Sequence, residues 1–285
     1  MLGISEVLPS RLLLRLIFLT SFVTSLYSWH PAAVITPAHC TQSSSRALLE
    51  RLRAEPWLSA AEVKLDNHPY IIAAESGLLT IAQRRAFVGE QYSIQMSDAR
   101  SFAVLAGHKA FVPERLAGAK VPSAVRHPAS GGREDLFQYL LGGEVYAADL
   151  LLAMAKQLGL SEEQCATWPI TAQAQAYPSY WARLALSRER AKGAAAVAVN
   201  FVAWGRMCRR LYAALASLPA IYNASADELA FIGYFGEEMP TLDDMAVEVL
   251  SEAACPSYEG LATAVRLVQE NELAFWDAVF AVYGT

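Results

Sequence analysis

Apolar residues recur at spacings of three and four along most of the chain from residue 43 onward, and few segments alternate with period two. This spacing is typical of helices packed by one face and not of strands. Helices are expected within residues 46–53, 80–97, 99–107, 133–159, 171–187, 193–218, 225–235, 242–254 and 258–283, with a further short helix opened by Ser161. The pattern therefore predicts an all-α bundle of about eight to ten helices.

Several residues mark the expected interruptions. The Asn67-His68-Pro69 sequence predicts a break, and Asp98 is expected to cap a new helix that follows it. Residues 108–133 are rich in Pro, Gly, Ala and Ser and predict an irregular connection. Gly142-Gly143 predicts a kink, and Pro178 predicts a bend or a restart.

The first part of the chain has the composition of a targeting peptide. No acidic residue occurs between Glu6 and Glu50, and Ser and Thr are frequent. An apolar run ends near Trp29 and is shorter than the roughly 20 residues that a membrane-spanning helix needs. We therefore expect residues 1–42 to be a targeting or transit peptide, followed by one domain over residues 43–285 that is not embedded in a membrane.

Two destinations fit this leader. The missing acids and the long Ser- and Thr-rich stretch are typical of import into an organelle, a plastid or a mitochondrion. The apolar run fits the secretory pathway instead, and a two-part signal of ER entry followed by plastid import fits both features.

Charge and composition narrow the class of function. The chain has 285 residues, a net charge of −5 and 54% hydrophobic residues, which suffices for one domain with a substantial core. No run rich in Lys or Arg is present, so a nucleic-acid partner is not expected.

The four cysteines, Cys40, Cys165, Cys208 and Cys255, match no CxxC or zinc-binding spacing. We expect free thiols in a reducing compartment, with Cys40 removed together with the leader.

Three carboxylates lie on apolar helical stripes. Glu272 is the clearest, because Val268, Phe275, Trp276 and Val279 occupy its helical neighbours. It is therefore expected to point into the bundle, where burial raises the pKa of an unpaired carboxyl and suits it to general acid–base chemistry.

Glu90 and Glu144 repeat the pattern on two other expected helices. Phe87 and Ile94 flank Glu90 by one turn, and leucines and alanines flank Glu144. Three inward acids on three helices predict a shared polar pocket, although each of them also fits a structural role with a hydrogen-bonding partner. Aromatic side chains expected to line the pocket are Tyr92, Tyr177, Tyr180, Trp204, Tyr234 and Phe235.

Other chemistries lack their residues. The five histidines include none at the Glu-x-x-His spacing of a helical di-iron site, and none is well placed as an axial haem ligand. No GxSxG, GxGxxG or P-loop motif is present. No metal site and no cofactor is therefore expected.

Five sequence blocks, in order along the chain, resemble those of the TenA/thiaminase II and PqqC-like superfamily. They are NHPYI (67–71), FVGEQY (87–92) with SDARSFA (97–103), GE (143–144) with LLLAMAKQLGL (150–160), AYPSY (176–180) and ELAFWD (272–277). Each block is weak alone, but the set covers most of residues 44–283.

The resemblance implies a haem-oxygenase-like helical bundle with a central pocket. In TenA proteins the pocket binds aminopyrimidines of thiamin salvage, and a Cys, an Asp and the Glu of the last helix serve hydrolysis. Glu272 matches that Glu, and Tyr177 and Tyr180 match pocket tyrosines. Gln91 stands at the position of the Asp, and the position of the Cys falls near Phe201 or Val202, so the hydrolytic machinery is altered.

Three functions stay open at this point. The first is a TenA-like protein that binds a small heterocycle and hydrolyses it, with Glu272 and Glu90 as catalytic residues. The second is a PqqC-like or di-iron-type oxidoreductase that acts on a small organic substrate. The third is a non-catalytic binding or assembly protein of the same fold. The expected substrate-binding residues are Gln91, Tyr92, Glu144, Tyr177, Tyr180, Trp204 and Phe235, and the resemblance also implies a homo-oligomer.

Overall fold

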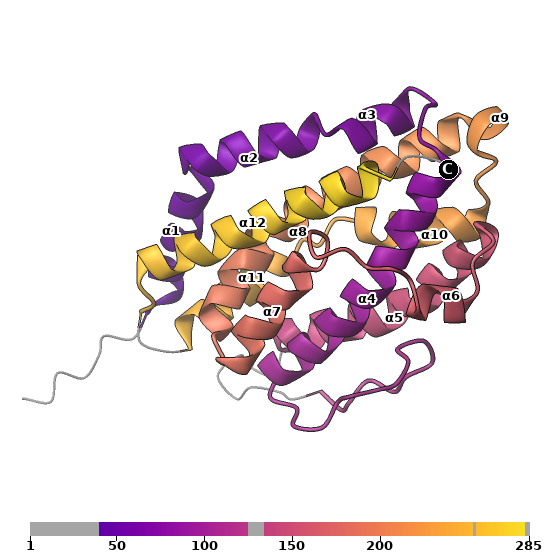
Figure 1. Ribbon diagram of the computed structural model, residues 1–285. Helices are drawn as coiled ribbons and strands as arrows, with labels where there is room; N and C mark the ends of the chain where they lie inside the picture. The colour runs from indigo at the N-terminus through magenta and orange to yellow at the C-terminus, as the bar shows by residue number, and fades with distance from the viewer. Residues whose placement is uncertain (1–39, 125–133, 253–254, 283–285) are drawn as a thin grey trace, which may run out of the picture. The chain divides into compact units, whose positions relative to one another are not determined.

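The computed structural model describes residues 40–124, 134–252 and 255–282, and every regular element in them is helical (Figure 1). Most of the predicted leader, the end of the connection after residue 124 and His127 lie outside the described residues. The helices are α1 (Gln42–Arg53), α2 (Pro56–Asp66), α3 (Pro69–Glu75), α4 (Ile81–Leu105), α5 (Leu136–Gln157), α6 (Glu162–Ala166), α7 (Ala176–Leu186), α8 (Arg190–Ser217), α9 (Pro219–Tyr222), α10 (Ala226–Gly236), α11 (Leu242–Ser251) and α12 (Tyr258–Phe280).

The longest helix, α8, is the centre of the packing. It contacts α3, α10, α11 and α12, and Figure 1 shows α2 and α3 lying along α12. The segment 193–198 is Gly-Ala-Ala-Ala-Val-Ala and is fully buried, because small side chains let neighbouring helices approach the axis of α8 closely. The second layer is α4, which packs against α5 and α7.

The prediction of two helices on either side of Asp98 is wrong. α4 runs without interruption from Ile81 to Leu105 and begins with a capping box between Thr80 and Gln83. Asp98 lies in the middle of this helix and is buried, with a relative exposure of 4%. An Asp can cap a helix only where the preceding backbone is non-helical, and here the turn before it is already packed against the core.

Other predicted interruptions differ in outcome. The break at 67–69 is confirmed, because α2 ends at Asp66 and His68 caps α3 with Pro69 in its first turn. The predicted kink at Gly142-Gly143 is not a helix boundary, since α5 continues through it. Pro178 lies in the first turn of α7, where a proline costs no hydrogen bond.

The twelve helices of the described residues exceed the predicted eight to ten, because α2, α3 and α9 were not predicted, while α4 replaces two predicted helices. The all-helical class is confirmed. No helix in the described part of the chain is both long and apolar enough to span a membrane.

A buried ion pair fastens α4 to α10. The guanidinium of Arg84 donates to the Glu228 carboxylate through Nε and Nη2, and its Nη1 donates to the backbone oxygen of Tyr222 at 3.2 Å. Both charged side chains are less than a tenth exposed. Removal of one partner from such a pair leaves a buried charge uncompensated.

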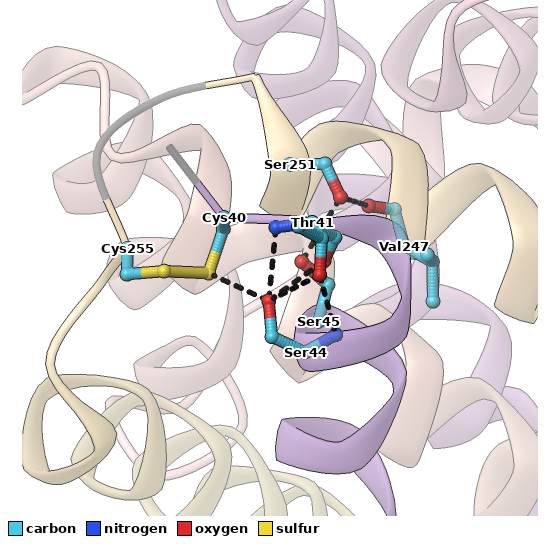
Figure 2. The surroundings of a disulfide bond; sticks show 7 residues. All are labelled: Cys40, Thr41, Ser44, Ser45, Val247, Ser251 and Cys255. Carbon is cyan, nitrogen blue, oxygen red and sulfur yellow. Dashed lines mark hydrogen bonds between the residues drawn. A yellow bond between two sulfur atoms is a disulfide. The ribbon is translucent and has the colours of Figure 1, made fainter. Parts of the chain in front are cut away.

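A disulfide joins Cys40, just before α1, to Cys255, just before α12 (Figure 2). Their Cα atoms lie 4.7 Å apart although 215 residues separate them in the chain. Beside the bond, Ser45 Oγ lies 3.0 Å from Ser251 Oγ, so polar contacts also join α1 to α11. The prediction of free thiols is therefore wrong for Cys40 and Cys255, whereas Cys165 and Cys208 are free and buried.

The Arg84–Glu228 pair gives a direct stability test. Glu228→Gln should lower the free energy of unfolding by about 3–5 kcal/mol, because it leaves the Arg84 charge buried without a counter-charge. The matched control is Asp66→Asn, which removes the carboxylate that pairs with Arg206 at 2.7 Å. Because both side chains of this pair are partly exposed, the substitution should lower the free energy of unfolding by at most about 1 kcal/mol. Urea unfolding followed by circular dichroism measures both, and equal losses would contradict the structural role of the pair.

The disulfide gives a second stability test. Cys255→Ser should lower the free energy of unfolding by about 2–5 kcal/mol, because the bond closes a very long loop and restricts the unfolded chain. Peptide mapping of the unreduced protein should recover a linked Cys40–Cys255 peptide. Alkylation of both cysteines without prior reduction would contradict the pairing.

Candidate functional site

A small cavity lies between α4, α5, α7, α8, α10 and α12. Its volume is about 30 Å³, and one enclosed water molecule needs about 10 to 15 Å³ by the same measure. We call this space the inner cavity. It is lined by Gln91, Ile94, Asp98, Glu144, Tyr177, Phe201, Trp204, Phe235, Glu272 and Phe275.

Glu272 is held by donors from two helices. Trp276 Nε1, one turn further along α12, donates to Oε1 at 2.8 Å, and Asn200 Nδ2 on α8 donates to Oε2 at 3.2 Å. Asn200 also accepts from the Tyr177 hydroxyl at 2.9 Å and donates to Gln269 at 2.7 Å. Burial raises the pKa of Glu272 to about 7, and the two hydrogen bonds oppose that rise.

Asp98 and Glu144 share the cavity with Glu272 but have fewer partners. Burial raises the pKa of Asp98 well above its usual value, and the nearby charges of Glu144 and Glu272 add to the rise. Burial also raises the pKa of Glu144 to about 8. Asp98 Oδ1 is fully buried and has no hydrogen-bond partner, which is rare for a native buried oxygen.

Aromatic rings form the remaining walls. Trp204 lies edge-on to Phe235 and to Phe275, with ring centroids 5.8 and 6.0 Å apart. Phe87 stacks on the outer side of Trp204 at 6.2 Å and fixes its plane. The carboxyl groups of the cavity are therefore bordered by aromatic rings that pack directly on one another.

None of the described residues that line the inner cavity is Lys, Arg or His. The cavity therefore combines three buried carboxyl groups with no basic counterpart in its wall. Such a site favours a ligand that brings hydrogen-bond donors or a positive charge.

Six of the nine predicted site residues meet at this cavity. They come from six helices and are Gln91, Glu144, Tyr177, Trp204, Phe235 and Glu272. Phe201, near the position that the resemblance assigns to the family Cys, also lines the cavity, whereas the thiol of Cys208 is buried elsewhere on α8.

The structure does not bring Glu90 to the cavity. Its carboxylate accepts the backbone N–H of Thr171 and the side-chain amide of Gln175, both at 2.7 Å. Gly89 beside it leaves room for Trp168, whose ring occupies the place of a Cβ. Glu90 thus attaches the segment before α7 to α4, and a catalytic role for it has no support in its position.

Tyr92 and Tyr180 also lie outside the inner cavity. The Tyr92 hydroxyl points to Glu162 on α6 at 3.5 Å, and Tyr180 faces Arg183 near the surface. Both tyrosines are only half-buried, because the helical stripe that contains each one turns away from the bundle interior.

Two functional residues were missed from the sequence. Asp98 could have been found from its spacing, because it follows Gln91 by seven residues and Ile94 by four on the same helix face. Asn200 carries no such signal, since its partners Tyr177 and Glu272 lie on other helices. In the described ranges no three His, Cys, Asp or Glu side chains are grouped so that they could hold a metal ion.

Comparisons with solved structures agree with the helical architecture. A TenA homologue from P. horikoshii superposes with a TM-score of 0.61 at 16% identity, covering 82% of this chain and 98% of its own. A TenA homologue from Pseudomonas syringae pv. tomato gives a TM-score of 0.62 at 15% identity, and the match covers 85% of this chain and 96% of its own. A structure described as a TenA family transcription regulator from Silicibacter gives a TM-score of 0.52 at 17% identity, and the match covers 86% of this chain and 99% of its own. At these identities the likeness concerns the fold.

A search of curated proteins finds no match for this chain. A family model, by contrast, matches residues 55–281, which contain all the residues of the inner cavity. The chain belongs to the TENA/THI-4/PQQC family.

Proposed function

We propose that this protein binds a small aminated nitrogen heterocycle, of the aminopyrimidine type, in the inner cavity and hydrolyses a bond on it. The observation that carries the proposal is the meeting of Asp98, Glu144 and Glu272 in one aromatic-walled space without a basic side chain in its described lining. An amino group and a ring N–H supply hydrogen-bond donors to this site, where Asp98 Oδ1 has no partner.

The two glutamates suit opposite proton-transfer roles. With a pKa of about 7, Glu272 is largely ionised slightly above neutral pH and can accept a proton from water. With a pKa of about 8, Glu144 keeps its proton there and can donate it to a leaving nitrogen. The hydroxyl of water thus joins the ring-bearing fragment as the bond to the leaving nitrogen breaks. Glu272 takes one proton from water and Glu144 gives one proton to the leaving nitrogen, so the protons balance.

The other residues hold the ligand and the base. Asn200 and Trp276 fix the orientation of the Glu272 carboxylate, and Tyr177 orients Asn200 in turn. The unpartnered oxygen of Asp98 is positioned to accept from an amino group. Trp204 and Phe275 supply apolar aromatic surface beside the ring.

A binding protein without turnover is the second candidate. It is favoured by Phe201, an apolar side chain in the cavity wall near the position that the resemblance assigns to the nucleophilic Cys. Tight binding of the heterocycle with no product would mark this function.

We also propose that a leader within the first 42 residues directs the protein to an organelle or to the secretory pathway. The Cys40–Cys255 bond supports a compartment that allows disulfides, which favours the secretory route, and requires that the leader be removed before Cys40. The proposed homo-oligomer is tested by light scattering of the purified protein.

Ligand binding is tested by thermal shift with 4-aminopyrimidines on the oxidised protein. A ligand at 100 times its dissociation constant should stabilise the wild type by about 2.7 kcal/mol. Glu272→Gln should reduce this gain, because it removes the carboxylate charge from the cavity. Glu90→Gln is the matched control, since Glu90 is equally buried but lies outside the cavity, and should retain the gain over its own unliganded state.

No gain with any aminopyrimidine would refute the heterocycle proposal, and an equal reduction in both variants would move the ligand away from Glu272. Product analysis by mass spectrometry then separates hydrolysis from binding alone.

The carboxyl pKa values predict how binding depends on pH. A permanently charged N-methylated aminopyridinium should bind about tenfold more tightly at pH 8 than at pH 6, because Glu272 ionises over that range. Glu272→Gln should flatten this dependence in isothermal titration calorimetry. The stability of the unliganded protein should change with pH in the opposite direction. Its folded state holds protons that the unfolded chain releases, so the free energy of unfolding should fall from about pH 5 to pH 8. Binding that weakens as the pH rises would contradict the assignment.

A further inference from the structure

One acceptor sequence for an N-linked oligosaccharide occurs in the chain. The chain has four asparagines, which are Asn67, Asn200, Asn223 and Asn271. Only Asn223 is followed two positions later by a residue with a hydroxyl group, which is Ser225, and the residue between them is Ala224. Asn-x-Ser, where x is not Pro, is the sequence that is glycosylated in the secretory pathway. A motif of three residues is weak alone, so its place in the fold decides its weight.

Asn223 lies on the surface, in the short turn between α9 and α10. Its side chain is exposed, and its amide group makes no hydrogen bond with any residue that the structure describes. Its backbone is left-handed, with φ 46° and ψ 36°, and its N–H donates to the Pro219 carbonyl at 3.0 Å to close α9. Asn is one of the few residues other than Gly that adopt this conformation readily. The amide is therefore presented on a turn where it can carry a bulky group.

Ser225 has a second role once the chain has folded. It caps α10, because its Oγ accepts the backbone N–H of Glu228 at 3.2 Å. An enzyme that reads this hydroxyl therefore acts before the first turn of α10 closes, while the chain enters the lumen of the endoplasmic reticulum. Since the sugar is attached to Asn223 and not to Ser225, the cap can form afterwards. The fold thus accommodates the modification without losing a contact.

The disulfide points independently to the compartment in which this modification takes place. Cys40 and Cys255 are joined, and such bonds form in the lumen of the endoplasmic reticulum and are rare in the cytosol. The bond and the turn at Asn223 share no residue and lie on different elements. Two separate features of the molecule therefore agree on passage through the same compartment.

We propose that Asn223 is an N-glycosylation site that takes an oligosaccharide from a polyprenyl diphosphate donor. Asn223 Nδ2 attacks the anomeric carbon of the first sugar, and the new N–C bond forms as the bond from that carbon to the diphosphate oxygen breaks. Nδ2 gives up one of its two protons to a base of the transferase, and the polyprenyl diphosphate leaves with the electron pair. The proposal rests on the secretory route proposed above for the leader.

The glycan covers an apolar part of the surface next to Asn223. Ile221 is 57% exposed and Leu78 is 72% exposed. The two segments lie together, because a Cβ added to Gly77 would lie 2.7 Å from Ile221 Cδ1. A bulky, hydrated glycan keeps other chains away from these side chains, so a homo-oligomer uses another face. The described lining of the inner cavity includes none of residues 219–225, so the glycan leaves the cavity open.

The test translates the full chain, with its own leader, in a cell-free system that contains microsomes of the endoplasmic reticulum. Protection from added protease measures entry into the lumen, and a mobility shift that peptide N-glycosidase removes measures the glycan. The wild type should be protected and should carry one glycan. Peptide mapping after the enzyme should find Asp in place of Asn223. Asn67 is also exposed but is followed two positions later by Pro69, so it should stay unmodified in the same map.

Three variants separate the acceptor sequence from the fold. Asn223→Asp should abolish the glycan, while Asp still tolerates the left-handed backbone. Ser225→Ala should also abolish it although the acceptor amide remains. Ser225→Thr should keep the glycan, because threonine supplies the hydroxyl that the transferase reads and also the cap of α10. Protection from protease should be equal in all four chains.

The outcomes distinguish the two proposals. Entry of the wild type into the lumen without a glycan would refute the site at Asn223 and leave the secretory route standing. Failure to enter the lumen would refute the secretory route and the glycan with it. A glycan that persists in Asn223→Asp would also overturn the assignment.

Discussion

The interior depends on the burial of one carboxylate, that of Glu272. A buried carboxylate without partners costs several kcal/mol, and Trp276 and Asn200 offset that cost by donating to its two oxygens. Asn200 can do so only while Tyr177 and Gln269 hold its amide in one orientation. One hydrogen-bonded network thus fixes α7, α8 and α12 relative to one another, and the aromatic walls pack around them.

The other two cavity acids are left without such a network. Asp98 Oδ1 has no partner, and the pKa values of Asp98 and Glu144 are raised mainly by burial. A fold that served stability alone would replace these groups by apolar side chains of similar size. The ligand that we propose would offset this cost by bringing hydrogen-bond donors, so the liganded site would be more stable than the unliganded one.

Sequence periodicity correctly predicted the features of the site that depend on a single helix. Glu272 and Glu144 were found because a stripe of apolar neighbours is a local property of α12 and of α5. The same signal misled for Glu90, because a stripe shows that a residue is buried but not which neighbour buries it. Asn200 and the Cys40–Cys255 pair depend on contacts between distant segments, which no local pattern encodes.

The rotation of α4 explains why its two acids differ in role. At 3.6 residues per turn, Asp98 lies about 20° from Gln91 around the helix but about 80° from Glu90. Asp98 therefore faces the cavity with Gln91, while Glu90 faces Thr171 and Gln175. Gln91 stands where the resemblance places the family Asp, and the carboxylate of Asp98 lies on the same face two turns further, about 10 Å along the axis. Asp98 lies near both Glu144 and Glu272, whose charges add to the rise of its pKa, so the acids of three helices interact within one cavity.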